Sequence, residues 1–452
     1  MTDVTMHGAR LAKIGLLAAV ISRVFGRLVG IGLVVLLARE SDPDTVAIYG
    51  YLLGAATLVA TFTDLGVAAV AGREVAAGRM PVDGALYAAL IPQSLSVLAA
   101  AAATVLLTVA AGPASVPWTA IALTALFVVV GGFVNLWAEL LRATGRVVLE
   151  GWLQMGSAVA LVVGGVVVVY GGGDVTDLLL IVVAKEAVVL VIMMVLIHPR
   201  RRAQVRTRQL LGQSLWVALG GTAVILLWRQ GTFVVATTGT VGALATYVVA
   251  TRFLDAGVTV AHTAGFGLVP GMSALANHPA EFRRAARQYI SLATVVGAGV
   301  AVIGMLAASP LTTIPFGENW GDAVPVVRLI ALSALPILVA FVAWPFLLAR
   351  NQVKWLAVGA LIATVAGLSI SLIIATWRPD ATAPAIGTAC GATVLALIFL
   401  VGLRDLLLRN HNPTRAGQLE PAVHEATANQ TPQPRPTPES GNPPVTARST
   451  EL

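Results

Sequence analysis

Long apolar runs alternate with short polar breaks along almost the whole chain. Each run is continuous over about 20 residues or more and lacks the alternating pattern of outer-membrane strands, so each predicts a membrane-spanning helix. About twelve spans are expected on this basis. Their expected limits are residues 11–38, 46–71, 83–111, 117–141, 149–170, 176–197, 210–236, 241–269, 286–308, 322–348, 354–376 and 382–408.

The amino-acid composition excludes a soluble protein with a charged surface. Of the 452 residues, 57% are hydrophobic and only 11% are charged, and the mean hydropathy is +0.85. Cys390 is the only cysteine, so the sequence offers no disulfide and no cysteine-based metal site. We therefore expect an all-α polytopic membrane protein, located as a multi-pass protein in the cytoplasmic (inner) cell membrane, with no cofactor.

Basic residues are concentrated in every second polar break, and short loops rich in Arg and Lys stay on the cytoplasmic side. The opposite breaks contain only Arg39 and Arg378. Both termini are therefore predicted to be cytoplasmic. The net charge of +7 reflects this asymmetry of the loops and does not indicate a nucleic-acid partner. The basic breaks contain Arg10, Lys13, Arg73, Arg79, Arg142, Arg146, Arg200, Arg201, Arg202, Arg206, Arg208, Arg283, Arg284, Arg287, Arg350, Lys354, Arg404 and Arg409.

The longest basic break, HPRRRAQVRTRQ at residues 198–209, divides the spans into six and six, as in a duplicated transporter. We expect an N-terminal six-helix lobe over residues 1–197, a basic cytoplasmic linker over 198–209 and a C-terminal six-helix lobe over 210–409. Residues 410–452 are rich in Pro, Thr, Asn and Gln and poor in bulky apolar residues. This composition predicts a disordered cytoplasmic tail.

Several tryptophans lie near the ends of expected spans, where aromatic rings anchor a protein in the membrane interface. We expect an anchoring role for them, and no aromatic box for a substrate. They are Trp118, Trp320 and Trp377 on the outer side and Trp152 and Trp355 on the inner side.

Two arginines stand within the first apolar run, which reads AAVISRVFGRLVGIGLVVLLAR from residue 18. Arg23 and Arg27 are four residues apart, so a helix places both side chains on one face. Each such charge costs roughly 2.5–3.5 kcal/mol at the centre of a membrane helix. We therefore expect both side chains to face a bundle interior or a hydrated cavity, away from lipid.

Further charges at membrane depth predict what that interior contains. Arg252 lies near the middle of the eighth expected span, Asp255 follows three residues later on the same side, and Arg229 lies in the seventh span. One interpretation is that such charges only neutralise one another inside the bundle. The other is that a cationic interior binds a phosphate or pyrophosphate, because guanidinium groups form paired hydrogen bonds with these oxygens and stay charged at any working pH.

Asp64, near Gly66 in the cytoplasmic third of the second span, fits two roles: a structural acid at a helix break, or a switch sensitive to protons or sodium. Asp255 is a second candidate for ion coupling or gating. Lys185 and Glu186 are adjacent and are predicted to point in different directions on their helix, as structural residues.

An enzyme is the alternative indicated by ARESDPDT at residues 38–45. Its acids, Glu40, Asp42 and Asp44, resemble those that hold a metal in membrane glycosyltransferases acting on lipid-linked sugars. The loop is only a few residues long and Pro43 makes it a turn, so it is too small to build an active site. The histidines show no ligand spacing, and no lysine follows a glycine as in a nucleotide-binding loop, so neither a metal nor a nucleotide site is predicted.

Five stretches resemble the polysaccharide flippases (Wzx-like) of the multidrug/oligosaccharidyl-lipid/polysaccharide exporter superfamily. The likeness covers nearly all of residues 10–408. It is carried by ARESDPDTVAIYGYL after the first span, TDLGVAAVAGREVA closing the second, ATYVVATRFLD in the eighth, FGENWGDAVPVVRLIALSALP entering the tenth and LLARNQVKWLAVGALIATVAGLSI linking the tenth to the eleventh.

The resemblance implies a MATE-like fold of two six-helix lobes and alternating access. It also implies export of polyprenyl-pyrophosphate-linked oligosaccharide from the cytoplasmic to the outer leaflet for cell-surface polysaccharide biosynthesis. Membrane lipids and polysaccharide polymerase machinery are the candidate partners. Lipid II flippases of the superfamily bind pyrophosphate with arginines in the first and eighth spans, where this chain has Arg23 or Arg27, and Arg252. Arg229 has no counterpart in these motifs and is a candidate on charge alone.

A drug or cation exporter of the same superfamily is the alternative to a flippase, and a membrane glycosyltransferase is a weaker one. A cation exporter should have an acidic cavity with aromatic walls, whereas the charges here predict a basic cavity. The sequence therefore favours the flippase.

Overall fold

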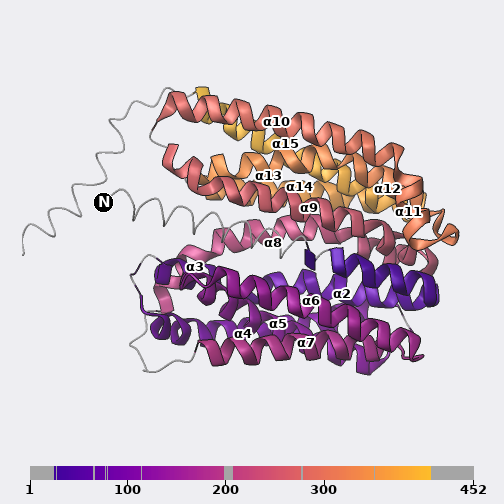
Figure 1. Ribbon diagram of the computed structural model, residues 1–452. Helices are drawn as coiled ribbons and strands as arrows, with labels where there is room; N and C mark the ends of the chain where they lie inside the picture. Colours follow the sequence, from indigo (N-terminus) through magenta and orange to yellow (C-terminus); the bar gives the residue numbers. More distant parts are fainter. Residues whose placement is uncertain are drawn as a thin grey trace, which may run out of the picture. The chain divides into compact units, whose positions relative to one another are not determined.

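The computed structural model describes residues 25, 26, 28–64, 67–76, 78, 80–113, 115–197, 207–275, 278–350 and 352–408. Within these ranges the chain is helical apart from short turns and contains no strand (Figure 1). Residues 28–40 are helical and precede the labelled helices. These are α2 (Pro43–Asp64), α3 (Val67–Ala76), α4 (Val82–Ala111), α5 (Trp118–Ala143), α6 (Val147–Tyr170), α7 (Val175–Leu196), α8 (Thr207–Thr238), α9 (Val241–Leu275), α10 (Pro279–Leu306), α11 (Ala308–Phe316), the 3-10 helix η1 (Glu318–Trp320), α12 (Ala323–Leu332), α13 (Ala334–Ala349), α14 (Val353–Ala375) and α15 (Thr382–Leu408).

The described part of the chain contains 11 helical segments that are long and apolar enough to cross a membrane. The first of the twelve expected spans, residues 11–38, lies largely outside the described residues. Many large apolar side chains are exposed, for example Leu106, Val195 and Leu306, as expected where a helix faces lipid. The predicted all-α polytopic membrane fold is confirmed.

Two expected spans are each divided between two helices. Within residues 46–71, α2 ends at Asp64 and α3 begins at Val67. Hydroxyl groups weaken the end of α2, because Thr61 and Thr63 each donate to a carbonyl three residues back. Within residues 322–348, α12 ends at Leu332 and α13 begins at Ala334.

The break between α12 and α13 has a cause in the sequence. Pro336 has no N–H to donate to the carbonyl of Leu332, and its ring crowds that carbonyl. Ser333, which lies between the helices, donates its hydroxyl to the carbonyl of Ile330 at 2.5 Å. The tenth span is therefore a pair of helices and not one continuous helix.

The ends of some helices differ from those expected. α10 begins at Pro279, seven residues before the expected limit of 286, with proline at the helix start where its missing N–H does no harm. α8 begins at Thr207 and therefore includes the last residues of the predicted linker. The short helices α11 and η1 precede α12 and were not predicted. Residues 198–206 of the linker and the tail from 410 onward lie outside the described residues.

The helices pack in two groups that follow the order of the chain (Figure 1). α5 contacts α2, α4 and α7 in the first group, and α9 contacts α10, α12 and α13 in the second. α2 also packs directly on α8 and α9, so it connects the groups. A side chain at Gly50 would overlap the methyl groups of Val248, and one at Gly265 would overlap the carbonyl oxygen of Phe341. These two glycines therefore allow α2 and α13 to approach α9 closely.

Most of the predicted tryptophan anchors are exposed, which fits a membrane interface. Trp118, Trp152, Trp355 and Trp377 all have exposed rings. Trp320 does not, because it is only 7% exposed and its indole N–H donates to the carbonyl of Ala38 at 3.0 Å. The predicted anchoring role of Trp320 is therefore wrong, and its ring packs against the end of the first helix.

Candidate functional site

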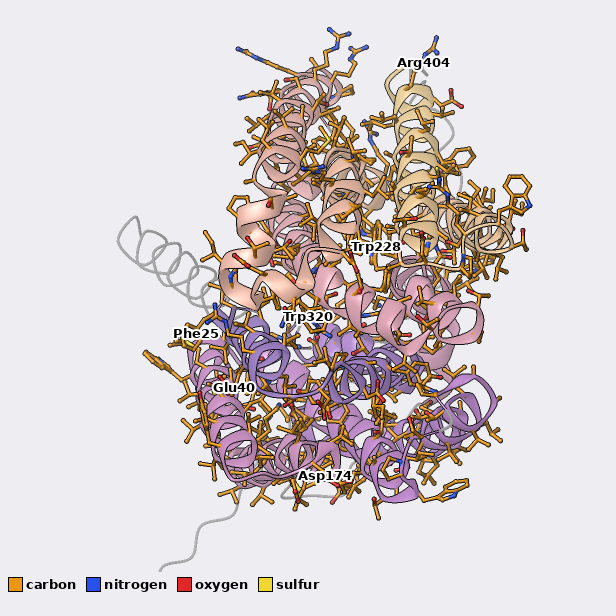
Figure 2. The ribbon with its side chains drawn as sticks, turned by 90° about the vertical axis from the view of Figure 1, so that its right-hand side faces the viewer. Phe25, Glu40, Asp174, Trp228, Trp320 and Arg404 are labelled. Carbon is orange, nitrogen blue, oxygen red and sulfur yellow. The ribbon has the colours of Figure 1, made fainter. Side chains whose placement is uncertain are left out.

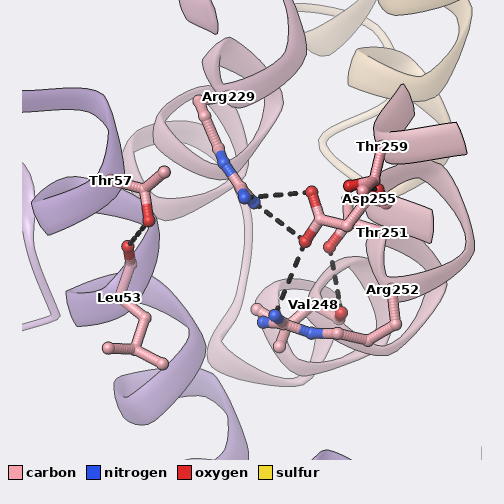
Figure 3. A network of polar contacts seen from close by, with 8 residues as sticks. All are labelled: Leu53, Thr57, Arg229, Val248, Thr251, Arg252, Asp255 and Thr259. Carbon is pink, nitrogen blue, oxygen red and sulfur yellow. Dashed lines mark hydrogen bonds and ion pairs between the residues drawn. The ribbon is translucent and has the colours of Figure 1, made fainter. Parts of the chain in front are cut away.

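Two arginines from consecutive helices share one carboxylate (Figure 3). Arg229 of α8 lies 3.0 Å from Asp255 Oδ1 and donates a second hydrogen bond to Oδ2 at 3.2 Å. Arg252 of α9 lies 3.6 Å from the same Oδ2. The three side chains are 11–14% exposed. This arginine cluster is therefore partly shielded from water, and it contains two guanidinium groups and one carboxylate.

The helices bring these groups together in two ways. Arg252 and Asp255 are three residues apart on α9, so their side chains leave the helix on the same side. Arg229 reaches them from α8, which packs against α9. The neighbouring hydroxyl groups of Thr251 and Thr259 bond to carbonyls of α9 itself, at Val248 and Asp255.

The cluster faces a cavity of about 210 Å³ between the two groups of helices. Its described lining includes one acid and three bases, and α2 forms the opposite wall with Leu53 and Thr57 (Figure 3). An excess of positive groups in a confined space of low dielectric attracts anions. The lining residues are Gly26, Gly30, Ile31, Val34, Tyr49, Leu53, Gly54, Thr57, Phe127, Leu161, Val182, Lys185, Arg229, Arg252, Asp255 and Ala256.

Lys185 is a lining residue that the sequence argument missed. It was expected to point away from Glu186, but its ammonium group forms an ion pair with the Glu186 carboxylate. It also approaches the hydroxyl of Ser157 on α6 at 3.4 Å. Its position in the middle of an apolar span was the signal available, because a lysine at that depth has to find polar surroundings.

The remaining predicted site residues fall outside what the structure describes. Arg23 and Arg27 are outside the described residues, as is the side chain of Asp64, the last residue of α2. Gly26 and Gly30 of the first helix do line the cavity. Of the predicted residues, the structure therefore brings together Arg229, Arg252 and Asp255.

A second cavity, of about 750 Å³, lies at the ends of the helices that are predicted to face outward. Beside this cavity, hydrogen bonds join the end of the first helix to the end of α11. Arg39 donates from Nε to the carbonyl of Pro315 and from a terminal nitrogen to that of Ile314, both at 2.5 Å. The last carbonyls of a helix such as α11 lack partners within the helix and accept these bonds. Figure 2 is viewed from this end and shows Trp320 between the two groups of helices.

The acids of the enzyme alternative lie where the first helix ends and α2 begins. Glu40, Asp42 and Asp44 are exposed there, and Asp44 is in the first turn of α2. Among the described residues, no three His, Cys, Asp or Glu side chains form a group that could hold a metal ion.

Solved structures of low sequence identity share this fold. The lipid II flippase MurJ, in an inward closed conformation, aligns with a TM-score of 0.68 and 12% identity over 85% of this chain and 87% of that one. A MOP superfamily transporter from Pyrococcus furiosus has a TM-score of 0.64 and 12% identity, over 87% and 95% of the two chains. A mutant of the MATE transporter VcmN from Vibrio cholerae has 0.63 and 14%, over 89% and 98%. The chain therefore shares the fold of these membrane transporters.

The sequence itself identifies the family. Residues 36–325 match the family described as polysaccharide biosynthesis protein. This match covers more than half of the chain, and the protein belongs to that family. No curated protein matches the sequence. Family and fold together support a multi-pass membrane transporter or flippase of the superfamily, in agreement with the resemblance seen in the sequence.

Proposed function

We propose that this protein is a flippase for polyprenyl-pyrophosphate-linked oligosaccharides. It carries the pyrophosphate and its glycan from the cytoplasmic to the outer leaflet by alternating access, with both chain termini in the cytoplasm. The product supplies cell-surface polysaccharide biosynthesis, in line with the family to which the chain belongs.

One observation carries the proposal: Arg229 and Arg252 converge from two helices on a cavity between the two groups of helices. Guanidinium groups bind pyrophosphate oxygens through paired, charge-assisted hydrogen bonds. Opposed arginines on different helices present such donors from two directions.

Asp255 is the competitor of the substrate in this mechanism. Its two oxygens accept from the arginines in the same manner as a phosphate does. A pyrophosphate entering the cavity displaces this carboxylate from at least part of its contacts. The exchange of one anion for another lets the site bind substrate without leaving buried cations unpaired at any stage.

The sequence supports four further roles for individual residues, which we include in the proposal. Arg23 and Arg27 extend the pyrophosphate site, since Gly26 and Gly30 of the same segment line the cavity. Asp64 and Asp255 are the candidates for ion coupling or gating, because an acid at membrane depth can respond to a proton or sodium gradient.

Alternating access requires a closed and an open outer side. The bonds from Arg39 to the end of α11, and from Trp320 to Ala38, are the contacts that keep the predicted outer side closed. They join segments from the two halves of the sequence, and water can replace them when the outer side opens.

The neighbour from Pyrococcus furiosus was described by the reverse polarity of its binding pocket, which suggests a different function for it. By the same logic the basic lining here favours an anionic substrate over a drug or cation.

The test is translocation of a fluorescent polyprenyl-pyrophosphate oligosaccharide in proteoliposomes, measured by access of an external quencher. Arg229→Gln and Arg252→Gln each remove charged hydrogen bonds and should slow flipping by about tenfold or more. The exposed Arg404, at the end of α15, provides the matched control Arg404→Gln and should flip like wild type. Equal rates for all four proteins, or transport of organic cations without any flipping, would contradict the proposal.

A further inference from the structure

An apolar cavity of about 390 Å³ lies beside the arginine cluster, among α9, α10, α11, α12 and α13. All of its described lining residues are apolar. Its volume falls in the range of about 300–1,000 Å³ that is typical of small-ligand sites. The flippase mechanism proposed above gives this cavity no task.

The two cavities lie on different faces of one helix, α9. On α9, Arg252 and Asp255 face the basic cavity, while Phe253, Gly257 and Val260 line the apolar one. The spacing of four and then three residues along the second set places its members on one face of the helix. Ala256 lines both cavities, so the two adjoin at this residue.

The apolar cavity is open toward lipid on one side. Val260, Val296 and Val300 are 52%, 45% and 48% exposed, as on a lipid-facing surface. Small residues make the hollow, among them Gly304 and Ala331, which pack directly on each other. Phe253 packs edge-on against Phe316 of α11, with ring centroids 6.2 Å apart.

We propose that this cavity binds the first isoprene units of the polyprenyl chain, next to the pyrophosphate. The inference depends on the proposed function, because it assigns a second part of the same substrate. A polyprenyl pyrophosphate has a strongly anionic group joined directly to a methyl-branched hydrocarbon. The protein presents a basic and an apolar cavity that adjoin at one alanine, which matches this order of groups.

The cavity contributes orientation more than affinity. A hydrocarbon chain leaving lipid for an apolar cavity gains little, because lipid tails are as apolar as leucine. A cavity that holds the first units fixes the direction in which the pyrophosphate enters, and it distinguishes a branched isoprenoid from a straight acyl chain by shape.

The first experiment is photo-crosslinking of the wild-type protein with polyprenyl pyrophosphate that carries a diazirine on its first isoprene unit. Crosslinks should fall on α9, α10, α12 and α13, at residues such as Val260, Val300 and Leu338. Unlabelled polyprenyl pyrophosphate should compete, and a phospholipid should not. Crosslinks elsewhere, or equal competition by the phospholipid, would overturn the inference and identify the cavity as an ordinary bilayer contact.

The second experiment fills the cavity. A Cβ at Gly257 meets no atom within 4 Å, so Gly257→Phe should place its ring in open space. Gly156 on α6 is likewise free of neighbours within 4 Å and is exposed, which makes Gly156→Phe the matched control. Gly257→Phe should reduce crosslinking and flipping by about tenfold, while inorganic pyrophosphate binds as in wild type.

The two proposals fail in different ways. If Gly257→Phe crosslinks and flips like Gly156→Phe, while Arg252→Gln still slows flipping, the tail site is wrong and the flippase stands. If no variant affects flipping, and inorganic pyrophosphate does not bind, the proposed function itself is wrong. The wild-type crosslinking map decides the inference even if Gly257→Phe fails to fold.

Discussion

Asp255 is the residue on which the arginine cluster depends. It accepts from Arg229 with both oxygens and lies within ion-pair distance of Arg252. Bringing charges out of water is unfavourable, and the mutual attraction of this cluster offsets that penalty only while both signs are present. The same carboxylate therefore stabilises the fold and occupies the place proposed for the substrate.

Asp255→Asn separates these two effects. Loss of the negative charge should lower the free energy of unfolding by about 1–3 kcal/mol, less than the 3–5 kcal/mol of a fully buried pair because the three side chains keep 11–14% exposure. Pyrophosphate should then raise the unfolding midpoint of the variant more than that of wild type, since its competitor is gone. Thermal unfolding in detergent, with sodium chloride of equal ionic strength as the control, measures both. A smaller pyrophosphate effect in the variant would show that Asp255 does not compete with the anion.

At the scale of the helices, close contact of α2 with α9 joins the two halves. α2 also contacts α8, so one helix of the first half touches two of the second. Such contacts depend on small residues, because helices in a membrane associate by packing and not by exclusion of water. Tyr51 and Tyr247 are both fully buried at this junction.

Gly50 provides the test of this junction. Gly50→Ala places a methyl group against Val248 and should lower the free energy of unfolding by about 1–3 kcal/mol through overpacking. Adding Val248→Ala removes the two clashing methyl groups but keeps the Cβ at 2.8 Å, so the double variant should regain part of the loss. Unfolding midpoints of the two single variants and the double variant form the cycle. Additive losses would show that the contact does not limit the packing.

Most helices could be predicted from the sequence, because a long continuous apolar run indicates a membrane helix without any knowledge of distant contacts. It missed the break at Ser333, although Pro336 signals it, and it missed α11, which is short and follows an apolar span without a polar gap. For the site, Arg252 and Asp255 could be paired from their spacing. The contact of Trp320 with Ala38 could not, since these residues are separated by 282 positions and no local pattern connects them.

At the scale of the whole molecule, the asymmetric distribution of basic residues predicts which ends of the helices face the cytoplasm. The connection after α4 is expected outside, and the connection after α5 is expected inside. Both contain exposed small polar residues, Ser115 and Thr144. The proposed direction of transport depends on this orientation.

Cysteine labelling tests the orientation. In a Cys390→Ser background, Ser115→Cys should react with an impermeant maleimide in intact cells, and Thr144→Cys should react only after the membrane is permeabilised. Each variant is the control for the other, because both positions lie in short exposed turns. The reverse pattern would invert the topology and, with it, the assignment of the Arg39 and Trp320 contacts to the outer side.

The Asp255 carboxylate also has a consequence for the step of the proposed transport cycle in which the protein returns without substrate. An exporter that has released its anion has to reset empty, and in alternating access the arginines stay in the hydrophobic middle of the membrane region, where they need a counter-ion. With Asp255 held between Arg229 and Arg252, the empty protein already contains that counter-ion. In the proposed transport cycle, the empty protein therefore resets without taking up chloride or phosphate as a counter-ion.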